Sequence, residues 1–160
     1  MAVAHLLYGI YGLAVFTLLA LPSWIFTALA PNPAAAWRVN RVAARIVLKL
    51  AGIPFTVSGV ENLPGVPCVM VANHCSYVDG IALLAALPTH FSFVAKREYL
   101  DHTLVRIYLQ ALGAQFVERF DTRQSVEDAQ RLAGEVRAGI SLGLFPEGTF
   151  RRMSGLASFR

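Results

Sequence analysis

Charged residues are scarce in this sequence, and they are missing from its beginning. Asp, Glu, Lys and Arg make up 15% of the 160 residues and apolar residues make up 56%, whereas average soluble proteins have about 25% charged and about 45–50% apolar residues. None of the four charged types occurs in residues 1–37. This composition argues against a fully solvated chain and indicates contact with a membrane. The length suffices for one compact domain but not for two.

Cysteine is also scarce, since Cys68 and Cys75 are the only two. Cys68 falls in a predicted strand and Cys75 lies beside a histidine, so we expect no structural disulfide, which favours a reducing compartment. The net charge is +4. Basic residues gather just after the uncharged beginning and favour anionic membrane lipids over nucleic acid as the partner: Arg38, Arg41, Arg45 and Lys49.

The uncharged beginning is long enough to cross a membrane. About 20 apolar helical residues suffice, and Ala2–Leu21 meets that length before Pro22, which breaks or kinks a helix. We expect either one spanning helix or a hairpin of two shorter helices around Pro22. A cleavable signal peptide ending near residues 28–30, and a buried helix of a soluble protein, stay open as alternatives. The expected interface anchors are aromatic: Tyr8, Tyr11, Trp24 and Trp37.

Residues 37–52 predict an amphipathic helix. Apolar residues at positions 39, 42, 43, 46, 47 and 50, and basic residues at 38, 41, 45 and 49, both recur at helical spacing on different faces. Such a helix lies on a membrane surface; an ordinary surface helix with a solvated basic face is the alternative. The basic excess places this side in the cytoplasm.

From residue 53 onward, short β-forming runs alternate with helical patterns. This alternation predicts an α/β fold with a largely parallel mixed sheet flanked by helices. Residues 1–52 would then anchor the chain, and residues 53–160 would form the α/β domain. Strands are expected at residues 55–60, 68–72, 91–95, 114–118 and 140–145. Helices are expected at Tyr77–Leu87, Leu100–Leu112 and Thr122–Ala138.

Polar residues follow three of the predicted strands, at residues 73–79, 118–121 and 146–149. In parallel α/β sheets, chemistry gathers beyond the carboxyl ends of the strands. The convergence of three separate polar clusters is more informative than any one of them.

The first cluster, "NHCSYVD", offers a histidine and a carboxylate. His74 and Asp79 would not meet within one continuous helix, but they can meet if His74 lies in the loop and Asp79 in the first turn of the next helix. The carboxylate could then accept an imidazole N–H and fix the tautomer, as in the Ser-His-Asp triad. The other ring nitrogen would act as a general base on a substrate hydroxyl.

Other interpretations of this cluster stay open. Asp79 could only favour a helix N-terminus electrostatically. Ser76 or Cys75 could be a nucleophile activated by His74, although we expect Cys75 to be a small buried or half-buried side chain. We expect no metal site, because no second ligand has suitable spacing to His74.

At this point the residues resemble a known family, the glycerolipid acyltransferases. "NHCSYVD" is similar to the family's NHxxxxD signature, and "FPEGT" at residues 145–149 is similar to its third block. "GAQFVER", which ends in Arg119, resembles the second block, and "FVAKREYL" resembles the segment after the first helix. The resemblance runs from about residue 53 to the end.

The resemblance implies that a lipid hydroxyl attacks an acyl thioester on coenzyme A or acyl carrier protein, without a cofactor. His74 would be the base and Asp79 would orient it. By the same resemblance, Arg119 and the turn at residues 147–149 hold the substrate's glycerol phosphate. Arginine suits phosphate because it can form paired hydrogen bonds. The full set of expected substrate-binding residues is Lys96, Arg119, Glu147, Gly148 and Thr149, with Glu147 anchoring the loop.

Two departures from the family pattern concern the end of the chain. Phe150 stands where the third block often continues with Arg, and a fourth block is absent, so we expect a fragment or a shortened member. The first hypothesis is a membrane-bound acyltransferase for lysophosphatidic acid on the cytoplasmic face. Its alternatives are an acyltransferase for another lysophospholipid, a non-catalytic lipid-binding module, and a lipid hydrolase that uses Ser76.

Overall fold

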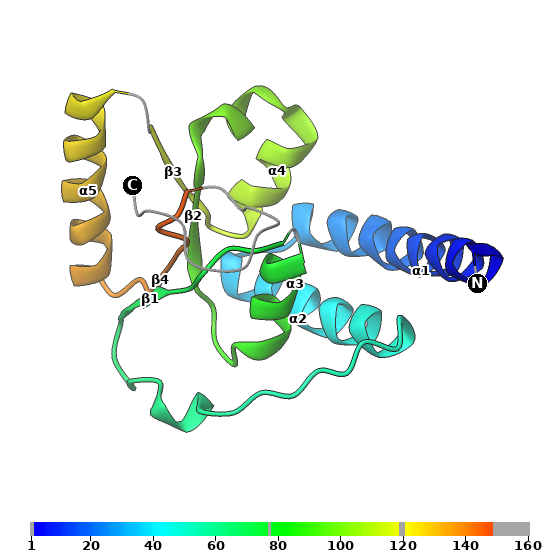
Figure 1. Ribbon diagram of the computed structural model, residues 1–160. Coiled ribbons are helices and arrows are strands. Elements are labelled where there is room, and N and C mark those ends of the chain that lie inside the picture. The colour runs from blue at the N-terminus through cyan, green and yellow to red at the C-terminus, as the bar shows by residue number, and fades with distance from the viewer. Residues whose placement is uncertain (1, 77, 119–120, 149–160) are drawn as a thin grey trace.

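A helical hairpin joined to an α/β domain makes up the structure (Figure 1). The computed structural model describes residues 2–76, 78–118 and 121–148. The hairpin consists of α1 (Ala2–Ala28) and α2 (Pro33–Leu50). The domain follows with η1 (Val60–Asn62), β1 (Val69–Val71), α3 (Val78–Ala86), β2 (Ser92–Lys96), η2 (Arg97–Asp101), α4 (Thr103–Ala111), β3 (Gln115–Val117), α5 (Thr122–Arg137) and β4 (Leu142–Leu144).

The four strands form a sheet in the order β1-β4-β2-β3, in which every neighbouring pair is parallel. Met70 of β1 and Phe93 of β2 lie on either side of Gly143 in β4. Parallel neighbours need crossover connections, and helices supply them. Figure 1 shows α5 on one side of the sheet and α3 with the hairpin on the other. The predicted α/β fold with a parallel sheet is confirmed.

Helix α1 runs through Pro22 without a break, so the expected alternative of two shorter helices around Pro22 is wrong. The hairpin turns instead at residues 29–32. Asn32 caps α2, because its side-chain oxygen accepts the amide of Ala35 at 2.9 Å, and Pro33 occupies the first helical turn. Proline removes one helical N–H, and the packing of α1 along α2 keeps the helix continuous.

A buried polar cluster holds the hairpin against the domain. Asn40 of α2 accepts hydrogen bonds from the hydroxyls of Ser23 at 2.9 Å and Tyr108 at 2.6 Å, and its own amide donates to the hydroxyl of Thr27. Ser23 and Thr27 belong to α1, and Tyr108 belongs to α4. Since buried polar groups stabilise a fold only when they are hydrogen-bonded, these side chains specify how the three helices pack.

The aromatic residues expected at a membrane interface have mixed roles. Trp37 is only 2% exposed, so its prediction as an anchor is wrong. Tyr8 and Tyr11 are exposed, and their hydroxyls donate to carbonyls at the C-terminal end of α2. The indole of Trp24 donates to a carbonyl of α4 at 3.1 Å. The two tyrosine bonds fix α1 antiparallel to α2, and the Trp24 bond joins α1 to α4.

The strand predicted at residues 55–60 is also wrong. Residues 53–59 run outside the sheet, and η1 follows. The β-forming residues there set a local preference, but a strand also needs a neighbour to pair with. The helix predicted over Leu100–Leu112 is divided between η2 and α4.

Helix α2 contributes to the core of the domain. Trp37 packs with Leu87 and Phe91, and Leu48 belongs to a second cluster with Ala44 and Ala85. The position of the hairpin is therefore coupled to the sheet through buried side chains.

Candidate active site

The parallel sheet brings two of the predicted polar clusters to one edge. Residues 72–76 follow β1, and residues 145–148 follow β4, which is the direct neighbour of β1. The amide of Ala72 continues the pairing by donating to the carbonyl of Leu144 at 3.0 Å. Gly148 has a φ of 64° and its amide donates to the carbonyl of Phe145 at 3.0 Å, which closes a tight turn.

His74 and Asp79 are in direct contact, as the sequence predicted. The Nδ1 atom of His74 lies 2.9 Å from Oδ2 of Asp79. His74 is in the loop, and Asp79 is in the first turn of α3. The same carboxylate oxygen accepts the amides of Cys75 at 2.7 Å and Ser76 at 2.8 Å. The loop is therefore wrapped around one carboxylate that also holds the imidazole.

The surroundings of Asp79 favour its ionised form. Partial burial acts to raise the pKa of Asp79, but the hydrogen bonds from the Ser76 amide, the imidazole and the Cys75 amide outweigh it, so the pKa lies below its usual value of 3.8. The side chains of His74 and Asp79 are 21% and 27% exposed, so the pair can be reached from solvent.

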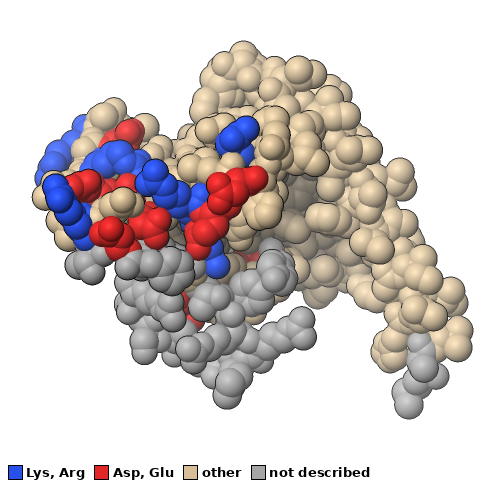
Figure 2. All heavy atoms as spheres, turned by 90° about the horizontal axis from the view of Figure 1, so that it is seen from above, with Lys and Arg blue, Asp and Glu red and all other residues tan. Residues whose placement is uncertain are grey.

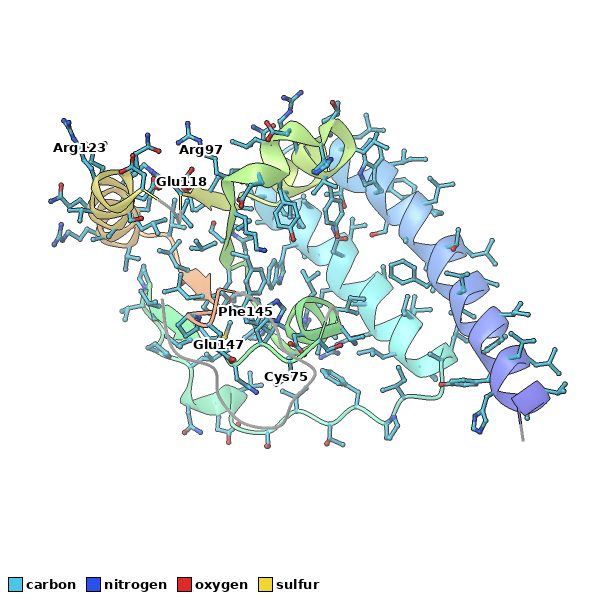
Figure 3. The ribbon with its side chains drawn as sticks, turned by 45° about the horizontal axis from the view of Figure 1, so that its top comes forward. Cys75, Arg97, Glu118, Arg123, Phe145 and Glu147 are labelled. Carbon is cyan, nitrogen blue, oxygen red and sulfur yellow. The ribbon has the colours of Figure 1, made fainter. Side chains whose placement is uncertain are left out.

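Glu147 fixes the loop from the opposite side. It is 3% exposed, and its Oε1 accepts the backbone amide of His74 at 2.8 Å. Figure 3 shows Cys75, Phe145 and Glu147 close to one another at the end of the sheet. Glu147 therefore anchors the loop, as expected, and it contacts the peptide that carries the imidazole.

Phe145 is a site residue that the sequence analysis missed. Its ring stacks on the imidazole of His74, with ring centroids 4.2 Å apart and planes 25° from parallel. The only signal was its place at the start of the "FPEGT" motif. His74 is thus held at three places: Asp79 bonds the ring edge, Phe145 stacks on the ring face, and Glu147 bonds the backbone amide.

The predicted substrate-binding residues are only partly described. Lys96 is the half-buried last residue of β2, at the same edge of the sheet as the loops. Gly148 lies in the turn next to Glu147. The predictions for Arg119 and Thr149 lie outside the described residues. Asp121, close to Arg119 in the sequence, caps α5 by accepting the amides of two residues of its first turn.

The alternative nucleophiles differ in their surroundings. Cys75 is exposed, so the expectation that it is buried or half-buried is wrong. The hydroxyl of Ser76 accepts the amide of Val78 at 3.2 Å. This bond is typical of a serine that satisfies a helix N-terminus, which gives Ser76 a structural role.

An apolar cavity of about 240 Å³ lies between the hairpin and the helices α3 and α4. Phe16, Leu19 and Trp24 line it from α1, and Ile81 lines it from α3, two positions after Asp79. Its polar lining comes from the Asn40 cluster. This space excludes charged groups and suits a hydrocarbon chain.

Comparisons with known proteins agree on one family. Residues 54–160 match the family model described as Acyltransferase. The chain is 34% identical over 113 residues to the 1-acyl-sn-glycerol-3-phosphate acyltransferase of Borreliella burgdorferi, a match that covers 70% of this chain and 45% of the relative. It is 34% identical over 106 residues to the lyso-ornithine lipid O-acyltransferase of Brucella abortus, covering 66% of this chain and 38% of the relative.

The fold has a counterpart among solved structures. The crystal structure of the 1-acyl-sn-glycerophosphate acyltransferase PlsC from Thermotoga maritima aligns with a TM-score of 0.75 at 20% identity. The alignment covers 99% of this chain and 67% of that protein. The present chain spans less than half of the length of the two curated relatives above.

Proposed function

Because the chain belongs to the acyltransferase family, we propose that it transfers a fatty acyl group from a thioester to the free hydroxyl of lysophosphatidic acid. Coenzyme A or acyl carrier protein would carry the acyl group, and the product would be phosphatidic acid for phospholipid synthesis. The observation that carries this proposal is the 2.9 Å contact between His74 Nδ1 and Asp79 Oδ2.

The chemistry follows from that contact. With Nδ1–H donated to the carboxylate, Nε2 carries the lone pair and can accept a proton. As the substrate oxygen attacks the thioester carbonyl carbon, Nε2 takes the hydroxyl proton and Asp79 stabilises the imidazolium. The C–O bond forms, the C–S bond breaks, and the imidazolium returns its proton to the leaving thiolate. No acyl-enzyme is required, so Ser76 keeps its structural role.

Substrate binding would use the other loops at the same edge. We propose that Lys96, Arg119, Gly148 and Thr149 hold the phosphate through cationic, amide and hydroxyl donors. Glu147 would act indirectly by fixing the loop, since its charge would repel a phosphate. The apolar cavity beside α3 gives an acyl chain a place outside water.

We also propose that the hairpin holds the protein on the cytoplasmic face of a membrane. Within α1, the stretch Val3–Ala28 contains an 18-residue window of mean hydropathy 1.8, and Leu6, Leu13 and Leu18 are more than 60% exposed. On the face seen in Figure 2, most of the charged residues gather over and beside α5, whereas α1 shows none. An exposed apolar helix of this kind needs a nonpolar environment.

The position of α2 favours a hairpin in one leaflet over a spanning helix. Tyr8 bonds the C-terminal end of α2, and Ser23 bonds Asn40, so α2 runs alongside α1. If α1 crossed the membrane, Arg45 and Lys49 on α2 would enter the hydrocarbon, at roughly 2.5–3.5 kcal/mol each. Lying in the interface, the same residues would meet anionic headgroups.

The test of the reaction is thiol release by the purified 160-residue chain in detergent. With acyl-CoA and lysophosphatidic acid, we expect thiol release that depends on the acceptor and disappears in His74→Ala. His102→Ala is the matched control, because His102 is exposed at the start of α4. Thiol release that persists in His74→Ala would refute the mechanism, and no release with any donor would favour a non-catalytic lipid-binding module. Parallel assays with acyl carrier protein and with other lysolipids determine the donor and the acceptor.

A further inference from the structure

Four aromatic rings from four different segments form a continuous stack. Trp37 of α2 stacks on Phe93 of β2, with ring centroids 5.8 Å apart, and Phe93 stacks on Phe145 at 6.0 Å. Phe145 in turn stacks on His74 at 4.2 Å. The three interplanar angles are 25°, 10° and 25°, so the rings are nearly parallel. We call Trp37, Phe93, Phe145 and His74 the ring column.

The far end of the ring column is fixed in the core. Trp37 is 2% exposed and packs with Leu87 and Phe91. His90 meets its ring edge-on at 5.6 Å, and the Nε2 atom of His90 lies 2.9 Å from the carbonyl oxygen of Leu112. Because Trp37 belongs to α2, the column starts on the hairpin and ends on the imidazole.

A glycine in the central strand makes room for the column. Phe93 lies directly beside Gly143 in the sheet. A Cβ atom on Gly143 would lie 2.6 Å from both Cδ1 and Cε1 of Phe93, and real Cβ atoms do not come so close. Gly143 is therefore needed for space, because a methyl group there would push the Phe93 ring away from the sheet and out of the stack.

The imidazole needs support beyond its hydrogen bond to Asp79. The outer torsion of a histidine side chain is broad, and a hydrogen bond at Nδ1 does not by itself set the plane of the ring. A stacked ring restricts this tilt, and such pairs contribute about 0.5–1.5 kcal/mol beyond the area they bury. The direction of the Nε2 lone pair depends on the plane of the ring.

We infer that the ring column is a positioning device, in which Trp37, Phe93 and Phe145 set the plane of the His74 imidazole and Gly143 makes the stack sterically possible. The inference rests on the proposed role of His74 as the base. None of the three aromatic residues need touch the substrate. The orientation of the His74 imidazole then depends on the position of α2, and hence on how the hairpin packs against the α/β domain.

The kinetic test uses paired substitutions. Gly143→Ala, Phe93→Leu and Phe145→Leu should lower kcat about 10- to 100-fold, since misplacements near 1 Å can have effects of that size, while KM changes less than about twofold. Phe145→Tyr keeps a ring and should retain most of the activity. Gly134→Ala, which adds its methyl group to open space on α5, and Phe55→Leu, in the other core cluster, are the matched controls.

The second readout does not depend on activity. A proton on an imidazole stacked face-to-face on Phe145 should resonate upfield in NMR spectra of histidine-labelled chain, with the signal assigned by its loss in His74→Gln. The upfield shift should disappear in Phe145→Leu, decrease in Gly143→Ala and persist in Gly134→Ala. An unshifted His74 signal in the wild type, or an unchanged kcat in both Gly143→Ala and Phe145→Leu, would overturn the inference.

The two readouts separate the inference from the proposed function. If His74→Ala retains activity, the general-base proposal fails, while the NMR shift still reports whether the column holds the ring. If Gly143→Ala does not fold, Phe145→Leu and Phe145→Tyr decide the matter. A loss of kcat with the His74 shift intact in Phe145→Leu would show that Phe145 acts by another route and would refute the positioning role.

Discussion

The backbone amide of His74 donates to Oε1 of Glu147 across 2.8 Å, which joins two loops that lie 73 residues apart in the sequence. Glu147 is 3% exposed. A buried carboxylate is tolerated only where donors satisfy it, so the bond holds the carboxylate and the loop in place together. The loop at residues 72–76 is thus part of the packed structure, although it contains neither helix nor strand.

Replacement of Glu147 should separate its hydrogen-bonding role from its charge. Glu147→Ala leaves the His74 amide without this acceptor, and we expect a loss of about 1–3 kcal/mol in the free energy of unfolding together with a lower kcat. Glu147→Gln keeps an acceptor oxygen and should lose less of both. Urea unfolding and thiol release measure the two effects, and equal losses in both variants would show that the charge is what matters.

Asp79→Asn should reduce turnover more than it reduces binding. The amide oxygen of Asn can still accept the Cys75 and Ser76 amides, but it offers no charge to stabilise the imidazolium. We expect kcat to fall about 10²–10⁴-fold with little change in KM. Asp121→Asn is the control, because Asn caps a helix as well as Asp does. A kcat within twofold of the wild-type value would refute the role of Asp79.

Acid should remove the contribution of Asp79 to stability. The pKa of Asp79 lies below 3.8 in the folded protein, so on acidification the unfolded chain takes up this proton first and stability falls. The stabilisation is present above the unfolded pKa and is lost as the pH falls through the folded one. The difference in unfolding free energy between wild type and Asp79→Asn should therefore shrink below about pH 4. A difference that stays constant from pH 6 to pH 3 would contradict this prediction.

The sequence predicted those parts of the site that lie close together in the chain. The loop position of His74 and the helix position of Asp79 follow from an apolar β-forming run that ends in "NHCSYVD", and the sheet follows from the alternation of strands and helices. The contact between Glu147 and His74 depends on β1 lying beside β4. The stacking of Phe145 on Phe93 depends on the register between β2 and β4, which places Phe93 beside Gly143. Neither pairing leaves a local signal in the sequence.

The failures have related causes. Residues 55–60 carry β-forming side chains, but none of the described strands pairs with them. Trp37 looks like a membrane anchor beside Arg38 and Arg41, yet the face of α2 that is buried is set by contacts with α3 and the sheet. Pro22 is a strong local breaker, whereas the packing of α1 along α2 is tertiary. In each case tertiary contacts, and not the local sequence, decided the structure.

Alkaline pH should weaken the junction between the hairpin and the domain. The hydroxyl of Tyr108 donates to Asn40 at 2.6 Å, and burial raises the pKa of Tyr108 to about 12. Between about pH 10 and 12 the unfolded chain gives up this proton while the folded protein keeps it, so stability falls as the pH rises. A difference of about two pKa units corresponds to roughly 2–3 kcal/mol in total.

Tyr108→Phe isolates this effect. At pH 8 the variant should be less stable than wild type by about 0.5–1.5 kcal/mol, because one donor to Asn40 is lost. Phe has no hydroxyl proton to lose, so the stability of the variant should not fall through this group as the pH rises. The difference in unfolding free energy from wild type should therefore vanish or reverse by about pH 11–12. Urea unfolding between pH 8 and pH 12 measures the difference, and Tyr99→Phe, at a 39% exposed tyrosine, is the control. If wild type and Tyr108→Phe lost stability in parallel across this range, Tyr108 would not be the group whose proton the packed junction retains.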